Sequence, residues 1–238
     1  DCLLSRGLGD VYKRQIKKNI KNLHLSVNPP DAKVKLSSPM RLKKNELKFF
    51  ILSRLNWIKE KRNKILNQPK LKKIIFENNE KVSLFGTNYK IKILISNKLS
   101  INLINQKLIY KIKENSSYEK LSLFFNLWLR DKLKNKILFL TMKWQKMINV
   151  KCSKVLIRKM KTKWGSCNTK SKAIIYNAEL AHKKTSLIEY IVVHELIHLL
   201  ERKHNHKFYL NLDKFLPDWQ SRRIKLNSNP LSFYTWSK

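Results

Sequence analysis

The chain has 238 residues, a formal net charge of +36 and 42% hydrophobic residues. This length can bury a core as one large or two small domains, and the hydrophobic content excludes a largely disordered protein. No apolar run approaches the ~20 residues that span a bilayer, and no secretory signal is recognisable, so we expect no membrane span and a cytoplasmic location.

The positive charge is spread along the whole chain. It predicts nonspecific, salt-dependent attraction to nucleic acid or anionic membranes, but it is weak support for a dedicated nucleic-acid function. Cys2, Cys152 and Cys167 are odd in number and widely spaced, which is a poor disulfide framework. No Cys-x-x-Cys pair exists, so a cysteine zinc knuckle is excluded, and we interpret Cys152 and Cys167 as buried or incidental thiols.

The first fifteen residues differ from the rest of the chain. They lack a starting methionine and hold two of the four glycines of the chain. The sequence that follows them is rich in Lys, Asn and Ile. They resemble translated vector or adapter sequence. We therefore treat residues 1–15 as a non-native leader and exclude them from fold prediction.

Residues 16–118 are predicted to form a strand-rich module with one amphipathic helix. Residues 22–37 alternate apolar and polar side chains around a Pro-Pro-Asp turn, which predicts a hairpin. Residues 44–66 carry apolar residues at helical spacing and predict the helix. Two further strand pairs are expected in residues 81–96 and 98–113.

Residues 119–238 are predicted to form the second domain. A helix start at 115–121 opens a long apolar-striped helix that runs to about Asn149. Strands are expected at 154–160 and 172–180, separated by a loop. Together these elements predict an α+β fold.

The segment "KKTSLIEYIVVHELIHLLERK" predicts the next helix, with Thr185 or Ser186 as its N-cap and Glu189 at capping-box spacing from Ser186. Within it, His194 and His198 lie one turn apart on the same face. Two neutral imidazoles so placed can bind one zinc ion. A helix whose histidines only cap or hydrogen-bond in the core is the alternative, but the His-Glu-x-x-His pattern favours a metal.

The glutamate of this pattern has a separate predicted role. Glu195 is rotated by about 100° from His194, which places its carboxylate beside the metal instead of on it. There it can take a proton from metal-bound water, whose pKa zinc lowers to about 7. The pattern therefore predicts a hydrolytic site.

Zinc needs a third protein ligand and an open position for catalysis. On a continuing helix, His204 would lie about 240° from His198 and about 9 Å further along the axis. For His204 to bind, the helix must end near the basic pair at 202–203, and the chain must curl back. His206 is the competing ligand. Two carboxylates are more distant alternatives: Glu201 and Asp213.

Residues 158–209, "RKMKTKWGSCNTKSKAIIYNAELAHKKTSLIEYIVVHELIHLLERKHNHKFY", resemble the core of the YgjP-like metallopeptidases, relatives of the SprT-like zincins. "KTKWGSC" matches the family's Lys-x-Arg-Trp-Gly-Ser-Cys segment, the His-Glu-x-x-His helix matches its Asp-Tyr-Val-Val-x-His-Glu-Leu-x-His helix, and His204 matches its third histidine. Further matching segments extend the resemblance over roughly residues 22–226: 54–62, 84–93 and 216–223.

The chain departs from the family pattern at four places. Lys163 replaces an arginine, Glu189 an aspartate and Lys203 an asparagine, and Asn205-His206 replaces a serine or proline. The last departure keeps His206 open as a ligand. None of these changes removes the residues of the expected catalytic set.

The resemblance implies a zincin-like catalytic domain and weakly implies a substrate cleft beside the zinc. In one interpretation, the Trp164–Cys167 loop lies beside the cleft and the Asn177 strand is the edge to which an extended peptide adds. In the other, Trp164 is a core plug and Gly165 a tight turn. The candidate cleft residues are Lys163, Trp164, Asn177 and Tyr209; Lys163, His206 and Tyr209 are candidates to stabilise the oxyanion, and Cys167 is a remote candidate for a fourth ligand or redox switch.

We therefore predict an α+β zinc-dependent hydrolase, a metallopeptidase that acts on a peptide or protein substrate. His194, His198 and His204 would hold one zinc ion, and Glu195 would deprotonate the bound water. Two other functions fit the same residues. One is a DNA-associated protease that acts on DNA-bound or crosslinked proteins, and the other is a noncatalytic zinc-binding scaffold.

Overall fold

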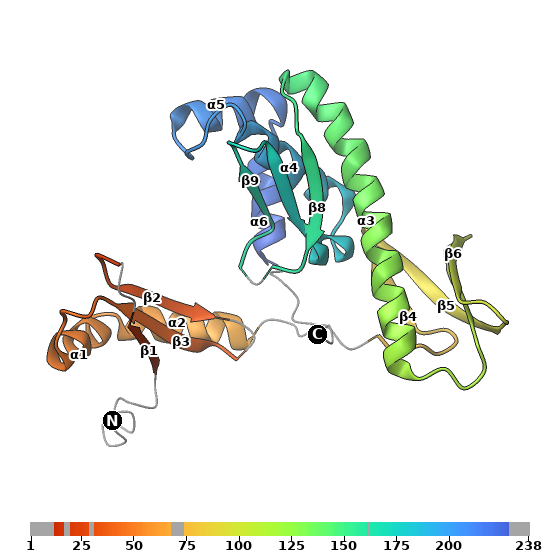
Figure 1. The fold of residues 1–238 in the computed structure, drawn as a ribbon, viewed down its shortest axis with the longest axis horizontal. Helices are drawn as coiled ribbons and strands as arrows, with labels where there is room; N and C mark the ends of the chain where they lie inside the picture. The colour runs from red at the N-terminus through yellow and green to blue at the C-terminus, as the bar shows by residue number, and fades with distance from the viewer. Residues whose placement is uncertain (1–11, 17–19, 29–30, 68–73, 161, 229–238) are drawn as a thin grey trace. The chain divides into compact units, whose positions relative to one another are not determined.

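The computed structural model describes the chain except residues 1–11, 17–19, 29–30, 68–73, 161 and 229–238. The fold is α+β, as predicted, with three small sheets in the described part (Figure 1). The chain divides into two compact units, residues 1–70 and 71–238. The boundary that the sequence suggested, between residues 118 and 119, lies inside the second unit. Cys2 and the Pro-Pro pair of the predicted hairpin turn fall outside the described residues.

The first unit holds a three-stranded sheet of order β1-β3-β2 and two helices. β2 (His24–Asn28) and β3 (Lys33–Ser38) pair antiparallel, which confirms the predicted hairpin. α1 (Lys44–Leu52) and α2 (Leu55–Leu66) follow. A small apolar core joins helices and strands: Val34, Leu36, Leu47, Ile51 and Ile58.

The single helix predicted for residues 44–66 is wrong, because the structure has two helices there. The hydroxyl of Ser53 donates a hydrogen bond to the carbonyl of Phe50 (2.9 Å), and Arg54 leaves the helical region with φ −114° and ψ 9°. Serine side chains compete in this way with the backbone bonds of a helix. Apolar spacing continues across the break, so periodicity alone could not reveal it.

Part of the segment excluded from fold prediction lies in a strand. β1 (Tyr12–Ile16) pairs parallel with β3, in the register Tyr12↔Val34 to Ile16↔Ser38. Pairing of this kind uses backbone groups at a free strand edge, so it requires little from the side chains of the added strand. The exclusion of residues 12–15 from the fold was therefore wrong, whereas their foreign origin stays a prediction.

The second unit begins with a four-stranded sheet of order β4-β5-β7-β6. β4 (Lys81–Leu84) and β5 (Thr87–Ile95) form one antiparallel pair, and β6 (Ser100–Ile104) and β7 (Lys107–Ile112) form another. Both predicted strand pairs are thus confirmed. β5 and β7 join the pairs in parallel.

The long helix α3 (Tyr118–Ile148) connects the two sheets of the second unit (Figure 1). The hydroxyl of Ser117 caps its start, and Asn149 ends it in the left-handed conformation (φ 58°). The Tyr110 hydroxyl of β7 donates to the carbonyl of Leu121 (2.7 Å), which ties the helix to the first sheet. One face of the helix is buried along its whole length: Leu121, Phe125, Leu129, Leu133, Ile137, Leu140, Thr141, Trp144 and Ile148.

The second sheet of this unit has the order β8-β10-β9. β8 (Lys154–Arg158) and β10 (Ala173–Asn177) are parallel, and β9 (Gly165–Asn168) pairs antiparallel with β10. The sequence predicts a loop in place of β9, because Gly-Ser-Cys-Asn shows no apolar alternation and no β-branched residue. Backbone pairing to β10 alone makes it a strand. The strand that ends at Asn177 is central, so the prediction that it forms the sheet edge is wrong.

The remaining elements are a short 3-10 helix, η2 (Ala178–His182), and the helices α4 (Thr185–Ile197), α5 (His206–Phe215) and α6 (Trp219–Ser228). α4 packs against α3, β9, α5 and α6 and is buried on nearly every side. This enclosure makes α4 the rigid centre of the unit. Within the described residues, no helix is long and apolar enough to cross a bilayer.

The predicted capping box at the start of α4 is wrong. The N-cap is Lys184, without a side-chain cap bond, and Glu189 points to other helices. Its carboxylate accepts hydrogen bonds from Trp144 Nε1 (2.9 Å) and Lys143 Nζ (3.1 Å) of α3 and from Arg222 Nη1 (2.9 Å) of α6. Glu189 therefore joins three helices.

We predict that Glu189→Gln lowers the free energy of unfolding at pH 7 by about 1–3 kcal/mol, since it weakens charge-assisted bonds. Burial alone would raise the pKa of Glu189, but the bonds from Arg222, Trp144 and Lys143 hold it below 4.5. The stabilisation is therefore present above the unfolded pKa and is lost as the pH falls through the lower folded pKa. Urea titrations over this pH range measure the difference.

The matched control is Asp131→Asn on the exposed side of α3, where the carboxylate accepts a hydrogen bond from the Asn135 amide (3.3 Å). This variant should stay within about 0.5 kcal/mol of the parent chain. Equal losses in the two variants would contradict a structural role for the Glu189 network.

Candidate metal centre and cleft

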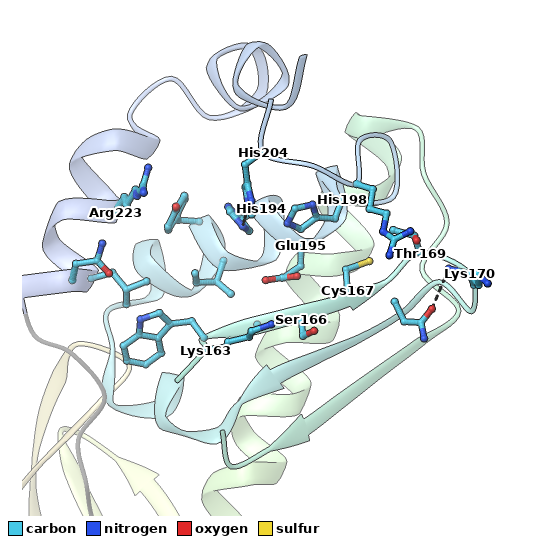
Figure 2. A pocket seen from close by; sticks show the side chains of 18 residues that line it. Lys163, Ser166, Cys167, Thr169, Lys170, His194, Glu195, His198, His204 and Arg223 are labelled. Carbon is cyan, nitrogen blue, oxygen red and sulfur yellow. Dashed lines mark hydrogen bonds between the residues drawn. The ribbon is translucent and has the colours of Figure 1, made fainter. Parts of the chain in front are cut away.

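Three imidazoles meet at the end of α4. His194 and His198 project from α4, and His204 comes from the segment between α4 and α5 (Figure 2). Their ligand atoms all lie within 4.8 Å of one another, and the Nε2 atoms of His194 and His204 are 3.0 Å apart. Among the described residues, no other group of three His, Cys, Asp or Glu side chains has this geometry.

A sharp helix end delivers the third imidazole. α4 stops at Ile197 with His198 as its C-cap, and the amides of Leu200 and Glu201 bond back to the Ile197 carbonyl (both 2.9 Å). The bend that the sequence required is therefore present, but it begins several residues before the predicted end at 202–203. Leu199 and Leu200 continue the apolar pattern past the true end, so the pattern extends the helix too far.

Phe208 packs against the three imidazoles, and no sequence pattern predicted this contact. Its ring is fully buried, with its centroid 5.0 Å from that of His194, 4.7 Å from His198 and 4.6 Å from His204. The Asn205 side chain caps α5 by accepting from the Phe208 amide (3.1 Å). The cap and the ring thus hold the returning segment against α4.

The environment of the three histidines keeps them neutral. Burial, and then the positive charges that His198, His204 and Arg223 can carry, lower the pKa of His194 to about 3. Burial likewise lowers the pKa values of His198 and His204 below 6.5. Neutral imidazoles offer the lone pairs that a metal ion needs.

The hydrogen bonds of the three rings differ. Nδ1–H of His198 donates to the carbonyl of Glu201 (3.1 Å), which leaves its Nε2 lone pair available. Such a second bond is the usual support of a metal-binding histidine. Nδ1 of His194 is buried without a partner among the described residues.

Glu195 faces the strand beside the imidazoles. Its side chain is 5% exposed and lies against the start of β9, where the Cys167 amide donates a hydrogen bond to it. Burial raises the pKa of Glu195 to about 8, although the positive charge of Lys163 and the Cys167 amide act in the opposite direction. A carboxyl group with this pKa can bind and release a proton near neutral pH.

Gly165 leaves room for the Glu195 carboxylate at this position, because glycine has no side chain. A Cβ atom added to Gly165 would lie 2.5 Å from Oε1 of Glu195 and 2.7 Å from its Cδ. The residue lies in β9 and its φ is not positive, so the interpretation of Gly165 as a tight turn is wrong. Here glycine is required by the close approach of a side chain and not by backbone conformation.

A cavity of about 840 Å³ opens over these groups, which is the size of a typical ligand site. Figure 2 shows it between β9 and the helices α4 and α6. The cavity is lined by residues from the β9 segment, α4, the returning segment and α6: Lys163, Trp164, Gly165, Ser166, Cys167, Asn168, Thr169, Lys170, Tyr190, Ile191, His194, Glu195, His198, Arg202, His204, Arg223, Leu226 and Asn227.

The predicted cleft residues divide into two groups. Lys163 and Trp164 line the cavity, and the half-buried Trp164 ring carries the Lys183 ammonium over it at 5.1 Å. Asn177 and Tyr209 do not line it. Tyr209 stacks on Trp219 instead, with ring centroids 5.4 Å apart. His206 is the exposed first residue of α5 and is also absent from the lining.

Asn177 has a structural position behind the cleft. It is fully buried, and its amide donates to the carbonyls of Met160 and Lys163 (both 2.8 Å). Its side-chain oxygen accepts from the amides of Met160 (3.3 Å) and Glu179 (3.2 Å). Asn177 therefore holds the loop that leads into β9. An asparagine at a strand end gave no sequence signal for this role.

The chain matches the family model described as "YgjP-like, metallopeptidase domain" over residues 21–229. It therefore belongs to the YgjP-like metallopeptidase domain family, which confirms the resemblance seen in the sequence. A comparison with curated proteins found no match.

Two solved structures are similar to part of the chain. One is the metallopeptidase zymogen abylysin of Pyrococcus abyssi, with 19% identity over 37% of this chain and 90% of that one, at a TM-score of 0.35. The other is the metallopeptidase zymogen jannalysin of Methanocaldococcus jannaschii, with 26% identity over 37% of this chain and 91% of that one, at a TM-score of 0.34. At such TM-scores these likenesses carry no weight, so family membership stands on the family match.

We predict that Gly165→Ala lowers the free energy of unfolding by about 1–3 kcal/mol, because the new methyl group must displace the Glu195 carboxylate. The loss should shrink by at least about 1 kcal/mol in a Glu195→Ala background, where the opposing atoms are gone. Urea unfolding of the parent chain, both single variants and the double variant measures this coupling. An equal loss in both backgrounds would show that Gly165 does not serve the contact with Glu195.

Proposed function

We propose that this member of the metallopeptidase family is zinc-dependent, with His194, His198 and His204 as ligands of one ion and Glu195 as the general base. One observation carries the proposal: three neutral imidazoles converge within 4.8 Å, and the buried Glu195 carboxylate of α4 lines the same cavity. Family membership supplies the reaction class, the hydrolysis of a peptide bond.

The donor set suits zinc. Zinc accepts imidazole nitrogen readily, and three protein ligands leave a coordination position open for catalysis. Magnesium and calcium prefer sets of oxygen ligands, which three histidines do not provide. His206 becomes a weaker candidate for the third ligand, since it is exposed on α5 and does not line the cavity.

Each reacting group has a defined task. A zinc ion held by His194, His198 and His204 would supply Lewis acidity, which would lower the pKa of a water molecule and polarise the scissile carbonyl group. Glu195 accepts a proton at a carboxylate oxygen from the water that attacks the carbonyl carbon. It then donates this proton to the amine nitrogen as the C–N bond breaks. The Cys167 amide and the glycine at 165 keep the carboxylate in position for both transfers.

The sheet edge offers a place for an extended substrate. β9 pairs with β10 on one side only, and its residues line the cavity. An extended peptide can add to such an edge through backbone hydrogen bonds. Of the three residues that the sequence suggested for oxyanion stabilisation, Lys163 alone lines the cavity, so Lys163 is the donor we propose.

We predict one zinc ion per chain in purified protein, measured by elemental analysis after dialysis. His204→Ala should lose most of the bound zinc, because two imidazoles hold the ion far more weakly than three. His206→Ala is the matched control and should keep the full amount. Zinc loss from His206→Ala with retention in His204→Ala would reverse the assignment of the third ligand.

We predict that Glu195→Gln keeps its zinc and loses hydrolysis of a peptide pool by about 10²–10⁴-fold, since the amide cannot accept the proton. Mass spectrometry of the digested pool measures both variants, with Glu119→Gln on the exposed start of α3 as the matched control. Unchanged hydrolysis in Glu195→Gln would remove Glu195 as the base. Full zinc loading without cleavage of any peptide by the parent chain would instead favour a noncatalytic zinc-binding scaffold.

A further inference from the structure

The wall of the cavity carries an unbalanced positive charge. Four basic residues line it: Lys163, Lys170, Arg202 and Arg223. The acidic side chain in the lining is Glu195, which is 5% exposed and lies against β9. None of the four basic residues forms an ion pair with an acidic residue in the part of the chain that the structure describes.

Two consecutive arginines of α6, Arg222 and Arg223, lie in different environments. Arg222 makes three side-chain hydrogen bonds, because Nε donates to Asp218 (2.8 Å) and Nη1 donates to Glu189 and the Ser186 carbonyl (both 2.9 Å). Arg223 is exposed, lines the cavity and has no hydrogen-bond or ion-pair partner among the described residues. The next position on a helix is rotated by about 100°, so the first arginine faces the helix bundle and the second faces the cavity.

Arg223 stands near the metal centre but not within it. Figure 2 shows it on α6 at one end of the cavity, with Lys170 at the other end and Glu195 between them. Arg223, His194 and His204 all line the same cavity. A substrate group bound there would lie close to the reacting atoms.

The chemistry of a guanidinium decides what such a group can be. Its planar fork of N–H donors matches a carboxylate and forms two parallel charge-assisted hydrogen bonds. No protein carboxylate among the described residues occupies this position.

We infer that Arg223 binds a carboxylate of the peptide substrate, so that the cleft selects peptides with an acidic side chain or a free C-terminus near the scissile bond. This inference rests on the proposed peptidase function. Arg223 is then a specificity-determining residue, and Lys163 and Lys170 add a field of the same sign along the cavity.

Bulk attraction is the competing explanation, since the whole chain carries a net charge of +36 and attracts any acidic peptide. The experiment must therefore remove one charge inside the cavity and one outside it. Lys225 provides the matched control, because it lies two residues from Arg223 on α6, is exposed and does not line the cavity.

The test measures binding to zinc-loaded Glu195→Gln protein, which holds peptides without cleaving them. The probes are fluorophore-labelled alanine hexapeptides with Glu or Gln scanned through each position, and each is made with a free or an amidated C-terminus. Fluorescence anisotropy gives the dissociation constants. Arg223→Met should weaken binding of the carboxylate peptides by at least about tenfold and leave the Gln-amide peptide within about twofold.

Lys225→Met should change every affinity by no more than about twofold. Loss confined to the Glu peptides assigns the carboxylate to a side chain, and loss confined to the free C-termini assigns it to the chain end. Equal losses in Arg223→Met and Lys225→Met, or no preference for carboxylate peptides, including no binding at all, would overturn the inference.

A second measurement separates recognition from catalysis. In the Glu195-containing enzyme, Arg223→Met should raise KM for carboxylate peptides and leave kcat within about twofold. A fall in kcat for all peptides, with KM unchanged, would place Arg223 at the transition state and refute carboxylate recognition. Absence of any cleavage by the zinc-loaded parent chain would count against the proposed function, whereas cleavage without carboxylate preference would count against this inference alone.

Discussion

The approach of the Glu195 carboxylate to the backbone of β9 is the constraint on which the centre of this protein depends. The carboxylate is almost completely buried, and only a glycine at 165 leaves room for it. The Cys167 amide compensates part of the desolvation that burial imposes. If β9 moved away, the carboxylate would lose this partner, and the wall of the cavity would lose its shape. The contact between Glu195 and Gly165 thus fixes α4 against β9 and shapes the wall of the cavity between them.

A second constraint acts on the imidazoles, and it is apolar. Packing against an apolar side chain holds the three rings close together. Phe208 provides that packing, with its ring against all three, and the Asn205 cap fixes the helix from which Phe208 projects. Local rigidity of this kind is what lets a site bind a metal without first reorganising.

The burial of α4 on nearly every side explains why so many apolar residues surround the His-Glu-x-x-His motif. α4 contacts α3, β9, α5 and α6, and Glu189 connects α3 and α6 to its middle. Its burial pattern is therefore nearly uniform around the helix and shows no single apolar face. The motif residues occupy the remaining edge, which borders the cavity. The buried faces of α4 thus contribute to stability, and the edge with His194, Glu195 and His198 borders the cavity.

Local patterns were enough to predict much of the protein. The alternation in 22–37, 81–96 and 98–113 reports a half-buried strand directly, and the spacing of His194 and His198 follows from the helical repeat. Two of the failures share a cause, because each depends on a partner distant in sequence. β9 exists through pairing with β10, and Glu189 serves α3 and α6 instead of the start of its own helix.

The sequence by itself determined the α+β class, the metal-binding pattern of α4 and the family, because these are written in short-range spacing and in a continuous motif. Only the tertiary structure decided that Gly165 meets Glu195, that Phe208 supports the imidazoles, and that Arg223 faces the cavity while Arg222 does not. These facts arise where separate elements touch. The geometry of such contacts depends on how the helices and strands pack, and one-dimensional spacing carries no information about it.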